Sequence, residues 1–320
     1  MPPSVDIVIR TKDRPVFLRR ALRSVVEQTF EDWRAIVVND GGDPDVVRDV
    51  LAGSGAESRT LVLDHEQSLG RWPAANAGLR AAEGSFLVLH DDDDTWHPEF
   101  LERATGYLAH RPDAVGVVSR EEIVWEELHD DHLVEVGREI FQPTLTAPLL
   151  GDLLLFNRFV PIGFLYRREL HEELGPYRED LAVVGDWDFN LRVLSRWPLE
   201  FLADEPYAFW HQRRGIVEGS AGNSVIAESR SHRHYDALVR DAHLREQVQR
   251  EGYGDTLHLT KFVDRRLLDL EHHVDREIEE AVAALNQRID VLQSELSRSV
   301  WEASTTERVR RWLRHRTGRA

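Results

Sequence analysis

Residues 85–94 read SFLVLHDDDD, a short apolar run that ends directly in four acids. Such a run is typical of a buried strand. Three earlier runs, at residues 5–10, 33–38 and 60–63, alternate with amphipathic segments in the same way. Because strands that alternate with helices form βα units, the sequence predicts an α/β protein with a mostly parallel sheet.

Acidic side chains follow two of these predicted strands. Asp40 lies in the turn NDGGDP at residues 39–44, and Asp91–Asp94 end the run quoted above. Ligands of open α/β sheets bind beyond the carboxyl ends of the strands, so we expect both groups in one crevice. Four successive acids repel one another, and a divalent cation that bridges to a phosphate would relieve the repulsion. If the run is extended, Asp91 and Asp93 project to the same side and can share one ion. A solvated acidic turn is the alternative.

The composition excludes several classes of protein. The chain has 320 residues, with 40 basic and 57 acidic side chains and a formal charge of −17. A surface this negative repels phosphate backbones, so we expect no nucleic-acid partner. Cysteine is absent, so any metal must bind oxygen or imidazole ligands. No window reaches the roughly 18 apolar residues of a membrane span, and no signal peptide is predicted, so we expect a cytoplasmic protein.

From residue 4 to about residue 215, the chain resembles the family 2 inverting glycosyltransferases, which have the GT-A nucleotide-sugar-binding fold. The motifs that carry the resemblance follow the family's order: VIRTKDRP at 8–15, SVVEQTFEDW at 24–33, VVNDGG at 37–42, NAGL at 76–79 with AEGSF at 82–86, and HDDDDTWHP at 90–98. The resemblance implies a mixed GT-A sheet flanked by helices. It also implies a nucleotide-diphosphate sugar as the donor and Mn²⁺ or Mg²⁺ as the cofactor.

The resemblance also implies roles for individual residues. Asp40 matches the acid that contacts the nucleotide base, although Asn39 replaces the acid before it. Asp93 and Asp91 match the metal ligands of the Asp-x-Asp motif, and Asp92 fills its variable position. The residues expected to line the sugar-donor site are Thr11, Asp13, Arg14, Asp40, Arg71, Asn76, Asp91, Asp92 and Arg213.

The segment VVGDWDFNLR at residues 183–192 resembles the family's Glu-Asp-Trp-Asp-x-x-Leu-Arg motif. The resemblance implies that Asp186 is the general base, with Gly185 in place of the glutamate. A helix N-cap is the alternative for Asp186. Asp188 is expected to support the helix start or to orient Arg192.

The run YAFWHQRRG at residues 207–215 predicts a strand that ends in a basic tip. Because arginine offers forked donors that suit a diphosphate, we expect Arg213 or Arg214 to clamp it. In similar enzymes a histidine after this strand lies near the metal, which implies His211 as a further metal ligand. The polar segment 218–224 is either a lid over the sugar donor or a linker.

The pattern changes after residue 224, which divides the chain into a GT-A domain at 1–224 and a helical region at 225–320. Apolar residues recur every three or four positions from Leu268 to Leu296, as in a coiled coil. This stripe favours a homo-oligomer, and packing on the chain's own catalytic domain is the alternative.

The last residues are basic and carry tryptophan. The members of this segment are Trp301, Arg308, Arg310, Arg311, Trp312, Arg314, Arg316 and Arg319. An arginine-rich helix with tryptophan is typical of a surface that rests on anionic lipid, which would place the protein peripherally at the inner membrane face. A solvated basic tail is the alternative.

The sequence thus predicts a metal-dependent inverting glycosyltransferase with a UDP- or dTDP-sugar donor and a hydroxyl acceptor, in polysaccharide, glycolipid or other glycoconjugate synthesis. A sugar nucleotidyltransferase is one alternative, but it needs a glycine-rich loop after the first strand, and residues 10–14 contain no glycine. A non-catalytic coiled-coil scaffold with a degenerate transferase domain is the other. The acids at Asp40, Asp91, Asp93 and Asp186 argue against the scaffold.

Overall fold

The computed structural model describes residues 4–129, 132–213, 229–316 and 318. The expected lid or linker at 218–224 and the alternative clamp Arg214 lie outside the described residues. The chain divides into two compact units, residues 1–242 and 243–320.

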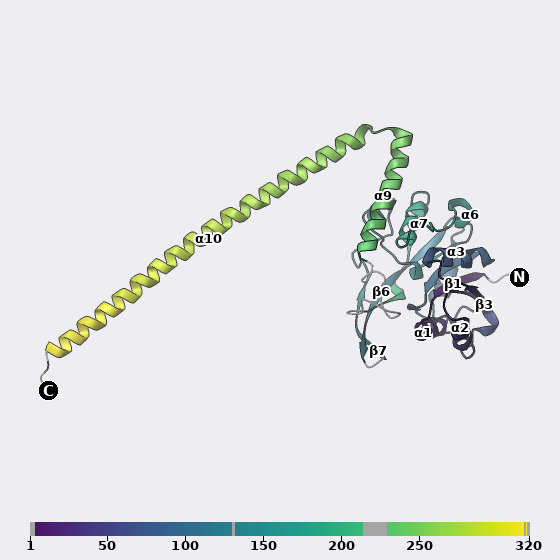
Figure 1. Ribbon diagram of the computed structural model, residues 1–320, viewed down its shortest axis with the longest axis horizontal. Helices are drawn as coiled ribbons and strands as arrows, with labels where there is room; N and C mark the ends of the chain where they lie inside the picture. Colours follow the sequence, from purple (N-terminus) through teal and green to yellow (C-terminus); the bar gives the residue numbers. More distant parts are fainter. Residues whose placement is uncertain (1–3, 130–131, 214–228, 317, 319–320) are drawn as a thin grey trace. The chain divides into compact units, whose positions relative to one another are not determined.

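A nine-stranded mixed sheet forms the centre of the first unit (Figure 1). Its order is β3-β2-β1-β4-β8-β6-β9-β5, and β7 pairs with β6. β1 to β4 run parallel to their neighbours in that group, whereas β8 is antiparallel to β4. The α/β fold with a mixed sheet is therefore confirmed. The strands are β1 (Val5–Thr11), β2 (Trp33–Asp40), β3 (Thr60–His65), β4 (Phe86–Asp91), β5 (Thr95–Trp96), β6 (Gly116–His129), β7 (His132–Ile140), β8 (Phe164–Arg167) and β9 (Phe201–Arg213).

Helices cover both faces of this sheet. Alternate residues of β1 enter opposite cores, because Ile7 and Ile9 pack with α1, α2 and α4 whereas Val8 packs with α3 and α7. A strand buried on both faces reads as a continuous apolar run, which is the signal seen in the sequence. The α-helices are α1 (Pro15–Val26), α2 (Pro44–Leu51), α3 (Arg71–Ala81), α4 (Phe100–His110), α5 (Leu150–Leu153), α6 (Leu170–Leu174) and α7 (Gly185–Leu194), with 3-10 turns at Glu57–Arg59 and Pro161–Gly163.

The carboxyl ends of the central parallel strands meet at one edge of the sheet. In the register of β1, Thr11 pairs with Asn39 of β2, and Arg10 pairs with Asp91 of β4. β1 is also the point where the strand order reverses, since β2 and β3 lie on one side of it and β4 on the other. Asp40 and Asp91 therefore end the two strands that flank β1 at the switch point, the usual ligand crevice of such sheets.

Two helices end the described chain. In the first of them, α9 (Ser229–Glu251), Val239 is buried. Arg240 of α9 donates to the carbonyl of Leu154 at 2.7 Å and lies over the ring of Trp187, 5.0 Å from its centre. The start of α9 thus packs on the sheet unit, which extends to residue 242.

The second helix, α10 (Gly254–Arg316), runs for 63 residues without a buried residue. The long helical carboxyl-terminal region is therefore confirmed. None of the helices within the described ranges combines the length and the apolar character that a membrane span requires.

Candidate active site

Four acids lie at the end of β4 and in the turn that follows it. Asp92 and Asp94 are buried, with exposures of 2% and 3%, whereas Asp91 and Asp93 are partly exposed. The amide of Asp94 donates to the carbonyl of Asp91 at 3.3 Å, so the chain turns here instead of continuing as a strand. Asp91 and Asp93 are thus the two acids that a ligand can reach.

Arginine side chains pair with both of these reachable acids. Arg10 donates to Asp91 from the neighbouring strand β1. Arg14 Nη2 donates to Asp93 Oδ2 at 2.8 Å, and the fully buried Arg213 donates to the same oxygen. Burial alone would raise the pKa of Asp93, but Arg14 and Arg213 outweigh it and hold the pKa well below its usual range. Asp93 is therefore an ionised carboxylate held between two guanidinium groups.

The buried carboxylate of Asp92 accepts hydrogen bonds from the end of β1 and from the loop that follows it. Its Oδ2 accepts from Thr11 Oγ1 at 2.7 Å, and its Oδ1 accepts from Arg14 Nη1 at 2.7 Å. Arg14 therefore bridges Asp92 and Asp93, and a buried acid fixes the direction of its fork.

Glu126 of β6 is a buried carboxylate that joins this cluster, and the sequence motifs did not reveal it. Its Oε1 accepts from Arg20 and lies 2.9 Å from His211 Nδ1, and its Oε2 lies 3.6 Å from Arg213 Nη1. Burial would raise the pKa of Glu126, but the contacts with His211 and Arg20 lower it overall. Glu126 is the negative charge that positions these three basic side chains.

His211 lies near the end of β9 with both ring nitrogens engaged. Its Nε2 lies 2.8 Å from Thr95 Oγ1, and its backbone amide donates to Asp94 Oδ1 at 2.9 Å. Burial lowers the pKa of His211, which favours the neutral imidazole. Glu126 beside Nδ1 assigns the ring proton to that nitrogen, so Nε2 accepts from Thr95. For His211 to bind a metal ion through Nε2, the ion has to replace the hydroxyl group of Thr95 at that nitrogen.

Asp40 ends β2 with its carboxylate fully hydrogen-bonded. Its Oδ1 lies 2.9 Å from His65 Nδ1 and accepts from the amide of Leu69 at 2.9 Å. Its Oδ2 accepts from Ser68 Oγ at 2.7 Å and from the amide of Gly70 at 2.9 Å. Burial would raise the pKa of Asp40, but these hydrogen bonds lower it overall. Asp40 therefore organises the loop at residues 65–70.

Two residues that were expected to line the sugar-donor site, Asp13 and Arg71, make hydrogen bonds with backbone groups. Asp13 has a left-handed φ of 51°, and its Oδ1 accepts from the amide of Asp43 at 3.0 Å. This bond ties the loop after β1 to the loop after β2. Arg71 begins α3, and its carbonyl accepts from Arg10 Nη1 at 3.3 Å.

Asn76 is buried in α3 and pairs with the segment before α7. Its Nδ2 donates to the carbonyl of Tyr177 at 2.9 Å and to Glu179 Oε1 at 2.8 Å. Its Oδ1 accepts from the amide of Tyr177 at 3.0 Å. These contacts favour a role in fixing the wall of the crevice over direct contact with the sugar donor.

Asp186 lies in the first turn of α7. Its Oδ2 accepts from Asn157 Nδ2 at 2.8 Å. Burial raises the pKa of Asp186, and the charges of Arg10 and Asp91 act on it as well. Asp186 is therefore near enough to the acid cluster to belong to the same site.

The N-cap alternative for Asp186 is wrong. The N-cap residue of α7 is Val184, which has a φ of 60° and no side-chain cap, so Asp186 lies inside the helix. A left-handed valine is costly because its side chain is β-branched, and such strain is found at functional sites. The prediction for Asp188 is confirmed, since Arg192 Nε donates to Asp188 Oδ2 at 2.9 Å.

The packing around Gly185 explains why this position has no glutamate, the residue that the family's motif has there. A Cβ atom at this position would lie 2.6 Å from Cε2 of the Trp72 ring and 2.8 Å from its Cδ2. Trp72 is buried, and the Arg10 guanidinium lies over it, 5.1 Å from the ring centre. The indole ring therefore occupies the space that a larger residue at 185 would need.

Gly185→Ala should lower the stability of the protein by about 1–3 kcal/mol, because the added methyl group overpacks against a rigid ring. The melting temperature in a thermal unfolding experiment measures this loss. Gly106→Ala is the matched control, because Gly106 lies within α4 and a Cβ there meets nothing within 4 Å. The control should be neutral or stabilising by up to about 1 kcal/mol. Equal melting temperatures for the two variants would contradict the packing argument.

The site also contains residues that the motifs did not single out: Arg10, Arg20, Glu126 and Asn157. One of them carried a signal in the sequence. Arg10 is a charged residue within the predicted strand at 5–10, and a charge buried in a sheet needs a partner. Nothing local marked Arg20 or Asn157, because their partners lie 106 and 29 residues away along the chain.

With the mixed sheet, its acid-lined switch point and the carboxylate at the start of α7 established, the protein falls in the class of GT-A glycosyltransferases. The match to a known family covers residues 6–175, more than half of the chain, and its description is Glycosyl transferase family 2. The chain belongs to this family.

Relatives and solved structures agree with that assignment. The uncharacterized glycosyltransferase YwdF of Bacillus subtilis is 34% identical over 189 residues, which are 59% of this chain and 67% of YwdF. The structure of TarS from S. aureus in complex with UDP-GlcNAc has a TM-score of 0.52 and 19% identity, and the match covers 67% of this chain and 60% of that one. The mannosyltransferase PcManGT from Pyrobaculum calidifontis, in complex with GDP-Man and Mn²⁺, has a TM-score of 0.50 and 16% identity, with 83% and 81% covered. At these identities the two structures show the fold alone.

Proposed function

We propose that the protein is a metal-dependent inverting glycosyltransferase that uses a nucleotide-diphosphate sugar and an acceptor hydroxyl. The observation that carries the proposal is the position of Asp186, a partly buried carboxylate on which the charges of Arg10 and Asp91 act. A base on one side of the crevice and a cluster for the diphosphate on the other are the two parts that inverting transfer needs.

The sugar donor would lie across the carboxyl edge of β1, β2 and β4. Asp40 and the loop at 65–70 would meet the base, with Thr11 and Asp13 beside them. UDP- or dTDP-sugars are favoured, and the fold neighbours TarS and PcManGT carry UDP-GlcNAc and GDP-Man. We expect no nucleic-acid partner, because the chain carries a formal charge of −17.

The reachable acids suit a divalent cation of the Mn²⁺ or Mg²⁺ kind. Among the described residues, no group of three His, Asp or Glu side chains lies together as a ready metal site. Such ions are commonly held by one or two carboxylates together with substrate phosphates and water, so Asp93 with Asp91 fits this chemistry. His211 would join after exchanging Thr95. The bound ion would offset the negative charge that develops on the leaving diphosphate.

Arg14 and Arg213 would exchange one partner for another when the sugar donor binds. Both now donate to Asp93, and both offer forked donors that suit phosphate oxygens. Phosphate oxygens would take the guanidinium groups and leave Asp93 available for the cation. Glu126 would keep Arg213 in place during this exchange, because it contacts Nη1 while Nη2 binds Asp93.

Asp186 would accept the proton of the acceptor hydroxyl as that oxygen attacks the anomeric carbon from the face opposite the diphosphate. Asn157 Nδ2 holds one carboxylate oxygen, so the other is the proton acceptor. The raised pKa makes this carboxylate a stronger base than an ordinary aspartate.

A screen of nucleotide sugars tests the proposal directly. UDP-, dTDP- and GDP-sugars are each added with Mn²⁺ or Mg²⁺, and the shift in melting temperature and the release of nucleoside diphosphate are measured. We expect one base to give both a metal-dependent shift and slow release by hydrolysis. A shift without any release would favour the scaffold alternative, and no shift with any nucleotide sugar would refute the proposal.

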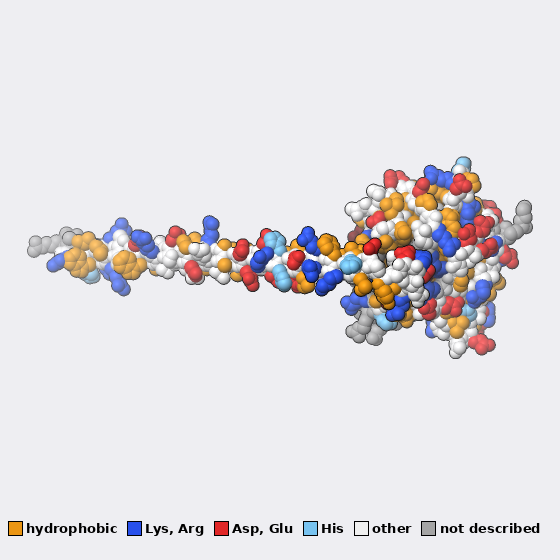
Figure 2. Space-filling model, turned by 90° about the horizontal axis from the view of Figure 1, so that it is seen from above, with side chains coloured by type: hydrophobic (Ala, Val, Ile, Leu, Met, Phe, Trp, Pro, Cys, Tyr) orange, Lys and Arg blue, Asp and Glu red, His pale blue; other side chains and the backbone are white. Residues whose placement is uncertain are grey.

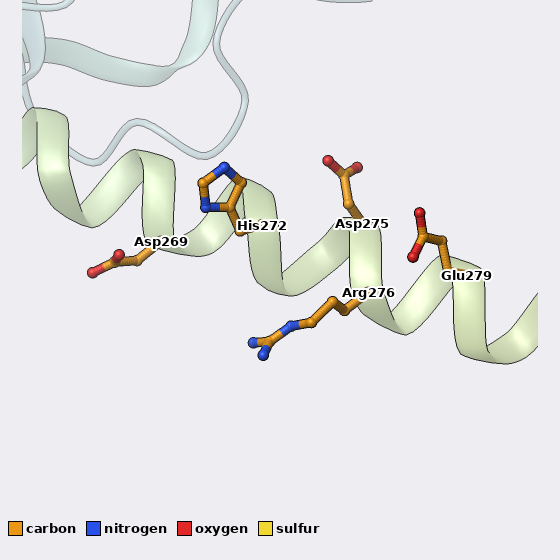
Figure 3. Close-up of a pocket in the computed structure, with 5 residues that line it drawn as sticks. All are labelled: Asp269, His272, Asp275, Arg276 and Glu279. Atoms are coloured by element: carbon orange, nitrogen blue, oxygen red, sulfur yellow. The ribbon is translucent and has the colours of Figure 1, made fainter.

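We also propose that α10 joins copies of this chain. Eleven apolar residues follow one another in steps of three or four positions from Val263 to Val300, and their exposures lie between 43% and 66%. The steps average 3.7 residues, nearer to the 3.67 of an 11-residue repeat than to the 3.5 of a heptad. Polar residues alternate with this apolar stripe along the sequence, and Figure 3 draws five of them on α10: Asp269, His272, Asp275, Arg276 and Glu279. The stripe consists of Val263, Leu267, Leu270, Val274, Ile278, Val282, Leu285, Ile289, Leu292, Leu296 and Val300.

In light scattering, the wild-type protein should have a mass that is a multiple of 36.9 kDa. Leu285→Glu together with Ile289→Glu should reduce the mass to that of one chain, because charges in the stripe oppose its burial. Ala283→Glu with Gln287→Glu is the matched control on another face of α10 and should leave the mass unchanged. A monomeric wild-type protein would refute this proposal without affecting the one for catalysis.

A further inference from the structure

Near residue 301 the apolar side chains of α10 move from the face of the stripe to the opposite face of the helix. At about 100° per residue, the apolar stripe continues past Val300 through Ala303 and then reaches Arg310 and Arg314. Trp301 and Trp312 lie about half a turn away from that direction. The end of α10 therefore has a second apolar surface, which a helix packed along the stripe leaves uncovered.

This second surface consists of Trp301, Val309, Trp312 and Leu313, and we call it the tryptophan face. The exposures of the two tryptophans are 67% and 54%, and Val309 and Leu313 are also exposed. Figure 2 shows hydrophobic side chains with basic ones beside them near this end of the helix. Two indole rings are far more apolar area than the solvated face of a helix normally carries.

The charge of α10 changes sign at the same place. Residues 254–300 contain ten acidic and six basic side chains, a formal charge of −4. Residues 301–316 contain two acidic and five basic ones, a formal charge of +3. At about 100° per residue, Arg308 and Arg316 lie beside the tryptophan face, and the guanidinium of Arg316 lies over the Trp312 ring, 4.5 Å from its centre.

We propose that the end of α10 docks on an anionic lipid surface through its tryptophan face. Tryptophan is suited to the headgroup region because its ring is apolar and its N–H is polar. The arginines reach phosphate groups with their forked donors while their stems cover the apolar boundary. A second copy of the chain is a poorer occupant, because parallel copies would bring Arg310 and Arg314 together along the line of the stripe.

Co-sedimentation of the full chain with vesicles tests this docking, and no sugar donor is present in the assay. The vesicles consist of phosphatidylcholine alone or contain about a third of phosphatidylglycerol, a source of negative surface charge. We expect binding to the anionic vesicles that weakens as salt is added, because surface charges are screened. Failure to bind would overturn the docking proposal and leave the transferase proposal intact.

Two pairs of variants separate the contributions of charge and tryptophan. Arg308→Gln with Arg316→Gln should weaken binding by about thirtyfold, since each arginine near the surface contributes about 1 kcal/mol. The same change at Arg265 and Arg266 removes equal charge elsewhere on α10 and should alter binding less than threefold. Trp301→Ser with Trp312→Ser should weaken binding about tenfold or more. Leu257→Ser with Leu259→Ser, whose exposures of 62% and 61% are similar, is its control.

The pattern across these variants decides the proposal. Circular dichroism at 222 nm, the standard α-helix signal, confirms that each variant keeps its helices. Equal loss of binding in a variant and its control would overturn the docking proposal. A change of oligomer mass in the tryptophan variant, with vesicle binding retained, would assign the tryptophan face to a second copy and would overturn it as well.

Discussion

Asp186→Asn should lower the rate of glycosyl transfer by about 10²–10⁴-fold, the range that a positioned general base contributes. The substitution preserves the shape of the side chain and the contact with Asn157, but it removes the proton acceptor. Affinity for the nucleotide sugar should change less than threefold if Asp186 acts on the acceptor hydroxyl, as proposed. Release of nucleoside diphosphate in the presence of acceptor measures the rate, and calorimetry measures the affinity.

The pH dependence of the rate gives a second reading of the same residue. A general base acts only when it is deprotonated, so the rate is present above its pKa and is lost as the pH falls through it. Because burial raises the pKa of Asp186, the rate of the wild-type enzyme should fall at a higher pH than an ordinary aspartate would give. The residual rate of Asp186→Asn should lack this step.

Asp180→Asn is a suitable control, because Asp180 is exposed and pairs with Arg178 at 2.6 Å, close to α7 in sequence. Its rate and pH profile should match those of the wild-type enzyme within twofold. If Asp186→Asn also retained the wild-type rate within threefold, Asp186 would not be the base, and another acceptor-side group would have to be sought.

The parallel half of the sheet could be predicted because each of its strands is a short apolar run that can be recognised from the local sequence. The runs at 5–10 and 33–38 became β1 (Val5–Thr11) and β2 (Trp33–Asp40), so only the polar ends of the strands were missed. Polar residues such as Asn39 pair with the neighbouring strand, yet their residue types are those expected of the turn that follows. Once the strands were placed, the general geometry of parallel sheets brought Asp40 and Asp91 to one edge.

The partners of the acids could not be predicted, because they depend on the order of the later strands. Arg20 of α1 and Glu126 of β6 are 106 residues apart, and their contact depends on the place of β6 in the sheet, beyond β4 and β8. No local pattern gives that order. The sequence therefore indicated four acids in need of a cation but not the arginines that already neutralise them.

The start of α7 is a second feature that local sequence rules did not predict. The N-cap rule favours an aspartate, and Asp186 stands where a cap is expected. The structure instead begins the helix from Val184 with a positive φ, a conformation that sequence rules assign to glycine or asparagine. The Trp72 ring, which is 113 positions earlier in the chain, occupies the space beside Gly185. Packing between residues so far apart in sequence is not part of the N-cap rule.

Asp93→Ala should abolish the dependence of sugar-donor binding on metal. In the wild-type protein we expect Mn²⁺ to strengthen binding on the order of a hundredfold or more, because the ion joins the diphosphate to Asp93. Without this carboxylate, the affinities with and without Mn²⁺ should agree within threefold. Calorimetric titration with nucleoside diphosphate, with Mn²⁺ and with a chelator, measures both affinities.

The arginines make a stricter test possible. Removing Asp93 takes away the oxygen to which Arg14 and Arg213 both donate, while Asp92 and Glu126 remain as their second partners. The loss of stability should therefore stay below the about 3–5 kcal/mol that a buried charge without any partner costs. Asp93→Asn keeps an oxygen acceptor and serves as the milder variant if Asp93→Ala unfolds. If the guanidinium groups exchange carboxylate for phosphate, both variants should bind nucleoside diphosphate in chelator at least as tightly as the wild-type protein does. Weaker binding in chelator would mean that Asp93 positions the arginines instead of competing for them, and an undiminished response to Mn²⁺ would place the metal elsewhere.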